Sequence, residues 1–286
     1  PSTMVRLGGG CKRIETRVIE SLSGPMLVLH IIVDCRDAMG ANAVNTMAEL
    51  IAPEVERLTL GRVHLKILSN LAAHRLARVE ATFTPKELSN DGTEENGNQI
   101  IQGILEAHHF ALADPFRAAT HNKGVMNAIS SVAVACGQDW RAIEAGCHSW
   151  ASFSNDNYSS MTEWKLDDEG CLVGSIETPM AVGIVGGASK VHPVAKTNLA
   201  ILGVTSASEL AGIICAAGLA QNLGALRALA TNGIQAGHMK LHSRNMAVSA
   251  GALGEEIEIV ATKLQSHIGP KTQTIVQKIL DEIRES

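Results

Sequence analysis

Apolar and polar positions divide the first part of the chain into short strands and one helix. Residues 26–35 are apolar and rich in β-branched side chains, which is typical of a buried strand. Apolar residues recur at helical spacing over 44–55, so we expect a helix there that Pro53 kinks or restarts. Strict alternation over 63–67 and 79–83 predicts two further strands, each with one face in water. These segments together indicate a small α/β unit.

The remainder of the chain has a mostly helical pattern. The polar segment 88–98 predicts a loop. The most apolar run, 210–230, contains Gln, Asn, Arg and three Gly residues, which suits a buried helix better than a membrane span. Ser206 and Glu209 precede this run with the spacing of a capping box. Amphipathic spacing over 275–283 predicts a C-terminal helix.

Composition and charge indicate a folded chain without general affinity for nucleic acid. The 286 residues are 45% hydrophobic and 19% charged, enough for one large domain or two to three smaller ones. A net charge of −5 gives no bulk attraction to nucleic acid or to an anionic membrane. The six cysteines form no C-x-x-C pair, so we expect reduced thiols, no metal site and a cytoplasmic protein.

Two segments combine small and polar residues in patterns that occur at ligand sites. Over 34–42 a strand gives way to a helix, where small residues let a ligand approach the backbone and the helix N-terminus attracts phosphate. The alternative is that Asp37 is only a helix cap. In the second segment, Arg117 suits a carboxylate and Lys123 suits a developing oxyanion, with Asn127 close by. The alternative here is a solvated loop.

Three further segments leave two interpretations each. Asp139 opens a helix, either as its cap or as a buried carboxylate that tunes a lysine. Gly186 and Gly187 suit a phosphate or a turn. His238 and His242 share a helical face, and without a third ligand a general acid is a better interpretation than a metal site. The alternative for His238 is a histidine hydrogen-bonded at a helix end.

Taken in order along the chain, these segments resemble one family, hydroxymethylglutaryl-coenzyme A (HMG-CoA) reductase in its soluble, class II bacterial and archaeal form. The resemblance runs over essentially the whole chain and lacks only the N-terminal third of the family's sequence. The matching text is DAMGANAVNTMAE (37–49), RAATHNKGVMN (117–127), GQDWRAIEAG (137–146), GIVGGASKVHP (183–193), GLAQNLGALRALATNGIQAGHM (218–239) and LHSRN (241–245).

The resemblance implies an α+β fold in three parts. Residues 1–71 would be the remainder of a ferredoxin-like, nucleotide-binding small domain inserted into a helical large domain. Residues 72–232 would be that large domain, which binds substrate, forms the dimer and contains one long buried helix over 209–231. Residues 233–286 would be a C-terminal helical flap. Family members form homodimers or higher assemblies, with substrate on one subunit and nucleotide on the small domain of its neighbour.

The resemblance also implies a reaction, the NAD(P)H-dependent four-electron interconversion of HMG-CoA and mevalonate plus CoA, part of isoprenoid metabolism. Lys123 would stabilise charge on the carbonyl oxygen, Asp139 would hydrogen-bond this lysine, and His238 would protonate the departing CoA thiolate. Arg117 and Asn127 would hold the substrate. The expected cofactor is NADH or NADPH, with a lean to NADH, and its contacts would be Asp37, Met39, Gly40, Asn42, Gly186 and Gly187.

One expected group has no match. The family carries a catalytic glutamate in an E-N-V-I-G-type motif before the DAMGAN text, and the 286 residues contain no such text. Two hypotheses of different class follow. The chain belongs to an active reductase, which we favour, or it is a truncated, catalytically incompetent homologue that acts only as a binding or interaction module.

Overall fold

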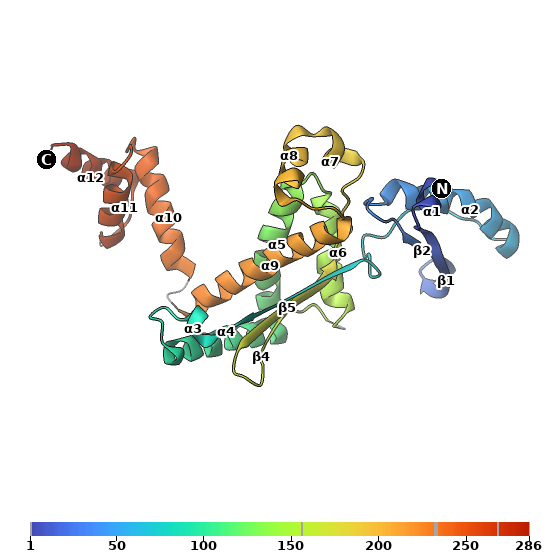
Figure 1. Ribbon diagram of the computed structural model, residues 1–286, viewed down its shortest axis with the longest axis horizontal. Helices are drawn as coiled ribbons and strands as arrows, with labels where there is room; N and C mark the ends of the chain where they lie inside the picture. The colour runs from blue at the N-terminus through green and yellow to red at the C-terminus, as the bar shows by residue number, and fades with distance from the viewer. Residues whose placement is uncertain (1, 156, 232–233, 268, 286) are drawn as a thin grey trace.

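The computed structural model describes residues 2–155, 157–231, 234–267 and 269–285, without the side chains of 2, 3, 234–241 and 285. Figure 1 shows the N-terminal elements at one end, a helical centre, and the last three helices at the other end. The fold is α+β, with a two-stranded and a three-stranded antiparallel sheet, as expected. The domain limits at 71/72 and 232/233 stay a prediction.

The N-terminal part is a hairpin beside one helix. After α1 (Ser2–Arg6), strands β1 (Gly10–Ser21) and β2 (Gly24–Asp34) pair antiparallel, and α2 (Ala41–Thr59) follows. The strand predicted over 26–35 is confirmed as β2, but the expectation that it is buried is wrong: its residues are exposed or half-buried, and Leu27 is 52% exposed. Helix α2 contains Pro53 and runs on without interruption, so the expected restart does not occur. Neither buried hydrophobic cluster includes a described residue of this part.

The strand predicted over 63–67 is wrong: the described backbone there has no regular structure. The N–H of Val63 donates to Glu56 Oε1 at 2.8 Å, and the N–H of Leu68 donates to Asn45 Oδ1 at 2.8 Å. Side chains of α2 therefore take backbone groups that a neighbouring strand would otherwise bind. The alternating apolar residues remain outside any core, and Leu65 is 85% exposed.

The central part builds a three-stranded sheet against helices. Strand β5 (Leu172–Pro179) lies between β3 (Leu76–Phe83), which confirms the strand predicted over 79–83, and β4 (Thr162–Leu166). The helices are α3 (Pro85–Leu88), α4 (Glu94–Ala113), α5 (Pro115–Ala135), α6 (Trp140–Phe153), α7 (Gly187–Val191), α8 (Pro193–Leu202) and α9 (Ala207–Ala230). Helix α9 contacts α4, α5, β3 and β5, so it is the centre of the core.

Helix α9 is the long helix that the sequence predicts. Ser206 caps it, because its hydroxyl accepts from the N–H of Glu209 at 3.1 Å. The Glu209 carboxylate accepts from the N–H of Thr205 at 2.7 Å, which makes a variant of the expected capping box. Among the described helices only α9 has the length and hydropathy of a membrane span. Its Leu210 and Ile214 are fully buried in the core, as expected for a buried helix.

The C-terminal part is a separate helical cluster. Helices α10 (Ile234–Ser249), α11 (Glu256–Ser266) and α12 (Gln273–Glu285) bury a small apolar core that includes Leu264 and Leu280. The helix predicted over 275–283 is confirmed as part of α12. Its Arg284 donates to the Glu256 carboxylate at 2.8 and 2.9 Å, which ties α12 to α11.

Candidate functional site

The loop over 37–40, between β2 and α2, is held against the central part of the fold. The Asp37 carbonyl accepts from the N–H groups of Ile184 at 2.9 Å and Val185 at 3.3 Å. The Asp37 carboxylate accepts from the N–H of Ala207, the first residue of α9, at 2.8 Å. Asp37 is therefore a helix cap, but of α9 and not of the adjacent α2.

The start of α2 is free of side-chain capping. Its N-cap residue is Gly40, with φ 100°, and no described side chain caps the helix. A Cβ at Gly40 would lie 2.3 Å from Cys35 Sγ, so only glycine fits both the backbone and the space. Asn42 is exposed in the first turn of α2. The first N–H groups of α2 are consequently available to a ligand.

A glycine-bearing segment, 182–187, lies directly against the 37–40 loop. A Cβ at Gly183 would lie 2.4 Å from the backbone nitrogen of Met39, so the two segments approach closely. Further along, Gly186 has φ 78° and Gly187 has φ 56°, and open space surrounds both. The sequence interpretations of a turn and of room for a ligand are therefore compatible.

An arginine that the sequence analysis did not single out joins these two segments. The guanidinium of Arg75 donates to the carbonyls of Met39 at 2.7 Å, Ala38 at 3.0 Å and Val182 at 2.5 Å, with a longer contact to Arg36 at 3.4 Å. Burial lowers the pKa of Arg75 below its usual value. All four acceptors are backbone oxygens that lie far from Arg75 in the sequence, so no local motif indicates this role.

The side chain of Gln138, the residue before Asp139, binds the 182–187 segment. Its side-chain amide donates to the Gly183 carbonyl at 3.0 Å and accepts from the Gly183 N–H at 2.9 Å. The adjacent Asp139 caps α6 by accepting from the N–H of Ala142 at 3.2 Å, and it lies 3.7 Å from Arg141. The cap interpretation of Asp139 is confirmed. Its carboxylate is exposed and not buried, because α6 begins at the surface.

Helix α5 carries the second group of predicted residues. The segment is helical throughout, so the loop alternative is wrong. Lys123 and Asn127 are both exposed and lie one turn apart on one face. Arg117 lies near the start of α5 and is half-buried, which lowers the pKa of its guanidinium.

The fold separates Lys123 from Asp139. Lys123 lies twelve residues before the end of α5 at Ala135, and Asp139 follows that end. A rise of 1.5 Å per residue places the two about 18 Å apart along the axis of α5. The hydrogen bond that the resemblance implies between them is therefore not formed within one chain.

The remaining predicted residue is His238, in the first half of α10. Its side chain lies outside the described residues, so its surroundings are not part of the site described above. Among the described residues no three His, Cys, Asp or Glu side chains gather as metal ligands.

A buried polar network lies behind α5. The Asn222 side-chain oxygen accepts from Trp164 Nε1 at 2.8 Å and from the Thr162 hydroxyl at 2.9 Å, and its Nδ2 lies 3.1 Å from His121 Nε2. His121 Nε2 also lies 2.9 Å from the hydroxyls of Thr162 and Ser160. The network joins α5, β4 and α9, whose residues lie far apart in the sequence.

The network fixes His121 as a neutral ring. An indole N–H can only donate, so Trp164 sets the orientation of the Asn222 amide. The Nδ2 of Asn222 must then donate to Nε2 of His121, which leaves the proton of His121 on Nδ1. Burial lowers the pKa of His121 to about 3, and burial lowers the pKa of the neighbouring His108 to about 4.

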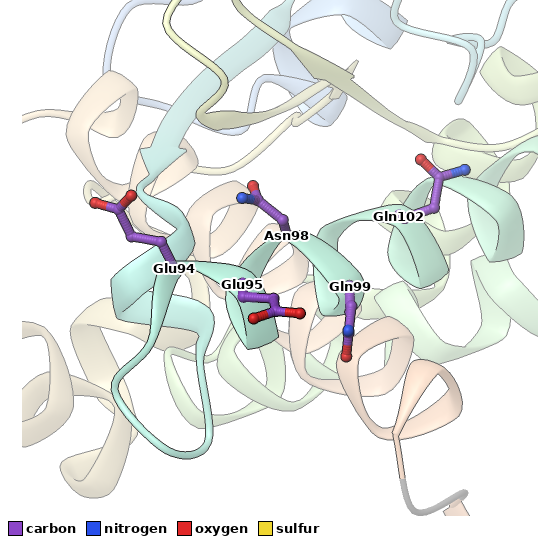
Figure 2. Close-up of a pocket in the computed structure, with 5 residues that line it drawn as sticks. All are labelled: Glu94, Glu95, Asn98, Gln99 and Gln102. Atoms are coloured by element: carbon purple, nitrogen blue, oxygen red, sulfur yellow. The ribbon is translucent and has the colours of Figure 1, made fainter.

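A hollow on α4 contributes nothing to this site. Figure 2 shows the residues that line it spread along one exposed side of that helix: Glu94, Glu95, Asn98, Gln99 and Gln102. None of the predicted site residues borders it. A surface formed by a single helix also lacks the converging groups that a ligand site needs.

Comparisons with known proteins agree with the resemblance. A family model described as hydroxymethylglutaryl-coenzyme A reductase matches residues 2–243. The curated 3-hydroxy-3-methylglutaryl-coenzyme A reductase of Archaeoglobus fulgidus is 53% identical over 281 residues, which are 98% of this chain and 62% of the relative. A probable enzyme of the same name from Borreliella burgdorferi is 40% identical over 84% of this chain and 54% of the relative. The chain thus spans less than two thirds of these two relatives.

Solved structures give the same result. The class II 3-hydroxy-3-methylglutaryl-CoA reductase of Streptococcus pneumoniae, bound to NADPH in open conformations, matches with a TM-score of 0.77 and 40% identity. The match covers 99% of this chain and 67% of that chain. A second structure of the S. pneumoniae enzyme matches with a TM-score of 0.78 and 39% identity over 99% of this chain and 66% of that one.

Proposed function

Because the chain belongs to the hydroxymethylglutaryl-coenzyme A reductase family, we propose that it carries the NAD(P)H-dependent interconversion of HMG-CoA and mevalonate plus CoA. The observation that carries the proposal is the junction of the 37–40 loop, the 182–187 segment and Asp139. Three segments that the family resemblance singles out, far apart in sequence, meet there through Asp37, Gln138 and Gly183.

The described residues fit a nicotinamide nucleotide. The uncapped N-terminus of α2 offers N–H groups and a positive dipole end to the phosphates, with Asn42 in its first turn. Open space at Gly186 and Gly187 leaves room beside it. Asp37, Met39 and Gly40 form the loop that leads into α2. When bound, the nucleotide supplies hydride. The S. pneumoniae relative binds NADPH, which supports NAD(P)H as the cofactor class and gives no support to the lean to NADH.

The exposed face of α5 suits the substrate. The Lys123 ammonium would stabilise negative charge on the thioester and aldehyde oxygen, where charge grows during hydride transfer. Asn127, one turn further on, would hold a polar group of the same substrate. Arg117 has no carboxylate partner among the described ion pairs, so its fork can bind the carboxylate of the hydroxymethylglutaryl group.

The distance between Lys123 and Asp139 supports a site shared by two chains. The face of α5 that bears Lys123 also exposes Phe116, at 85%, and Val134, at 57%. These two apolar side chains lie at opposite ends of α5, and a second copy of the chain packed along this face would cover both. Trp140, beside Asp139, is 42% exposed as well. We therefore propose a homodimer in which Asp139 of one chain approaches Lys123 of the other and hydrogen-bonds its ammonium group.

His238 would act on the leaving group, the CoA thiolate. Release of CoA as a thiolate would leave a strong nucleophile beside the aldehyde, and a proton on sulfur prevents its return. A histidine supplies that proton near neutral pH. The helix α10 that carries His238 belongs to the C-terminal cluster, which meets the central part mainly through α9.

The test is oxidation of NADH and of NADPH with HMG-CoA by the purified 286-residue chain. Turnover that Lys123→Ala removes would support the proposal in full. A folded chain without turnover, whose activity returns when the residues of a longer relative are added at its N-terminus, would support the reductase assignment for the longer protein. A folded chain that stays inactive in both forms would contradict the proposal and favour a binding module.

A further inference from the structure

Arg75 is placed where the sheet of the central part meets the two proposed nucleotide segments. Its own carbonyl accepts from the N–H of Met180 at 2.9 Å, which fixes its backbone beside the paired strands β3 and β5. From this anchor the side chain reaches the 37–40 loop on one side and Val182 on the other. We propose that Arg75 is a positioning residue that fixes the 37–40 loop to the 182–187 segment so that both can bind the nicotinamide nucleotide; this rests on the proposed function.

The contacts require an arginine. A guanidinium presents N–H donors in a planar fork, and here the two terminal nitrogens reach different carbonyls. A lysine has a single nitrogen and cannot span the same acceptors. None of the described ion pairs includes Arg75, so its direct partners are backbone carbonyls, while the more distant carboxylates of Asp34 and Asp37 also stabilise its charge.

The other contacts at the junction are short but few. The Asp37 carbonyl binds Ile184 and Val185, the Asp37 carboxylate binds the N–H of Ala207, and Gln138 binds Gly183. The described N-terminal part adds no buried cluster that would hold the 37–40 loop by packing. Arg75 thus provides a large share of what fixes the loop. Its loss should leave the loop attached but imprecise.

Loss of the Arg75 contacts should weaken the binding of the nucleotide and not that of the substrate. The α5 face with Lys123 and Asn127 lies on another element and makes no described contact with Arg75. A mispositioned 37–40 loop therefore weakens nucleotide binding while substrate binding on α5 persists. A general loss of stability would instead weaken both ligands and lower the melting temperature without selectivity.

The first experiment compares Arg75→Lys with Arg78→Lys. Arg78 lines the same crevice, which has a volume of about 230 Å³, but its partner is the exposed Glu177. Binding of NADPH and NADH is measured by nucleotide fluorescence, and KM values for nucleotide and for HMG-CoA are measured by turnover. We expect Kd and KM for the nucleotide to rise about tenfold in Arg75→Lys, from the loss of one or two hydrogen bonds. The KM for HMG-CoA and all constants of Arg78→Lys should stay within about twofold.

A second pair of variants distinguishes the positioning role of Arg75 from a failure of the protein to fold. Gly183→Ala places a Cβ 2.4 Å from the Met39 nitrogen and forces the two segments apart without touching Arg75. Gly224→Ala on the open side of α9 meets nothing within 4 Å and is the control. We expect Gly183→Ala to weaken nucleotide binding selectively, as Arg75→Lys does.

The outcomes are distinguishable. If the unsubstituted protein binds neither nucleotide, the proposed function fails, and the role of Arg75 fails with it. If it binds nucleotide and both Arg75→Lys and Gly183→Ala match their controls, only the positioning role is overturned. Equal weakening of nucleotide and HMG-CoA in both variants would also overturn it. Selective weakening in Arg75→Lys supports it, whereas selective weakening in Gly183→Ala alone would show that the junction does not depend on Arg75 and would overturn the role.

Discussion

The carboxylate of Asp37 accepts a hydrogen bond from the N–H of Ala207, which lies 170 positions later in the chain, at 2.8 Å. This single contact joins the start of the central helix to the loop that leads into α2. An N–H group at the start of a helix has no partner within the helix, and here it donates to a charged carboxylate. The helix dipole favours a negative charge at this end. One side chain thus serves both the fold and the proposed nucleotide site.

The contact predicts that Asp37→Ala lowers the stability of the protein. The free energy of unfolding should fall by about 1 kcal/mol, the usual loss on removing a helix cap. Asp37→Asn keeps an oxygen acceptor and should lose less than half of that. Urea unfolding of both variants measures the difference, and an unchanged midpoint in Asp37→Ala would mean that the N–H of Ala207 is satisfied in another way.

A shared site predicts recovery of activity in mixed dimers. Lys123→Ala and Asp139→Ala chains should each be inactive alone. Coexpression should restore roughly a quarter of the wild-type activity, since half of the dimers are mixed and each of those has one intact site. Recovery would not occur if both residues acted within one chain. The turnover of purified mixtures, with each variant alone as control, decides between the two arrangements.

The two halves of the reaction should respond differently to Lys123 and His238. Lys123→Ala should abolish reduction of both HMG-CoA and free mevaldehyde, because charge grows on oxygen in both. His238→Gln should slow only the thioester step, by about 10²–10⁴-fold, since mevaldehyde releases no thiolate. Parallel rates with the two substrates test this, and equal losses in His238→Gln would remove its assigned role.

The buried network predicts a costly substitution at Asn222. Asn222→Ala would remove the oxygen that accepts from the indole N–H of Trp164 and from the Thr162 hydroxyl, and it should destabilise the protein by about 3 kcal/mol. Asn98→Ala is a matched control, because Asn98 lies on the exposed side of α4 seen in Figure 2. Its effect should stay within about 0.5 kcal/mol. Thermal unfolding of the two variants provides the comparison.

His108 and His121 predict a stability that falls in mild acid. Burial lowers the pKa of His108 to about 4 and that of His121 to about 3. The unfolded chain binds these protons near pH 6.5, so below that pH the unfolded state holds more protons and is favoured. From pH 7 to pH 5 each histidine should lower the unfolding free energy by about 2 kcal/mol. His121→Gln should show a weaker pH dependence in urea titrations.

Local patterns predicted much of the fold because they report which face of an element meets the core. Helix α9 and strand β3 follow directly from apolar spacing and alternation. The segment 63–67 shows where this kind of prediction fails. Alternation indicates that a segment is able to form a strand, but it does not indicate whether a partner strand is present. In this chain the side chains of Glu56 and Asn45 bind its backbone instead.

The site was predicted in its parts and not in its arrangement. Motif text pointed to Asp37, Lys123 and Asp139, but spacing alone could not reveal that α5 separates the last two. Arg75 and Asn222 were missed for a physical reason: their partners lie far along the chain and present backbone oxygens or buried rings. Such roles depend on the tertiary fold and leave no periodic signal.

The contacts of Arg75 have a consequence for how this junction can change over evolutionary time. Its guanidinium binds only carbonyl oxygens, a group that every amino acid carries. The side chains of Ala38 and Met39 can therefore change without breaking the connection, whereas Val182 is fully buried in the core and is constrained by packing. Gly183 has no such freedom, since any side chain would meet the Met39 backbone. The junction thus combines backbone contacts that tolerate changes of side chain with one position, Gly183, that does not.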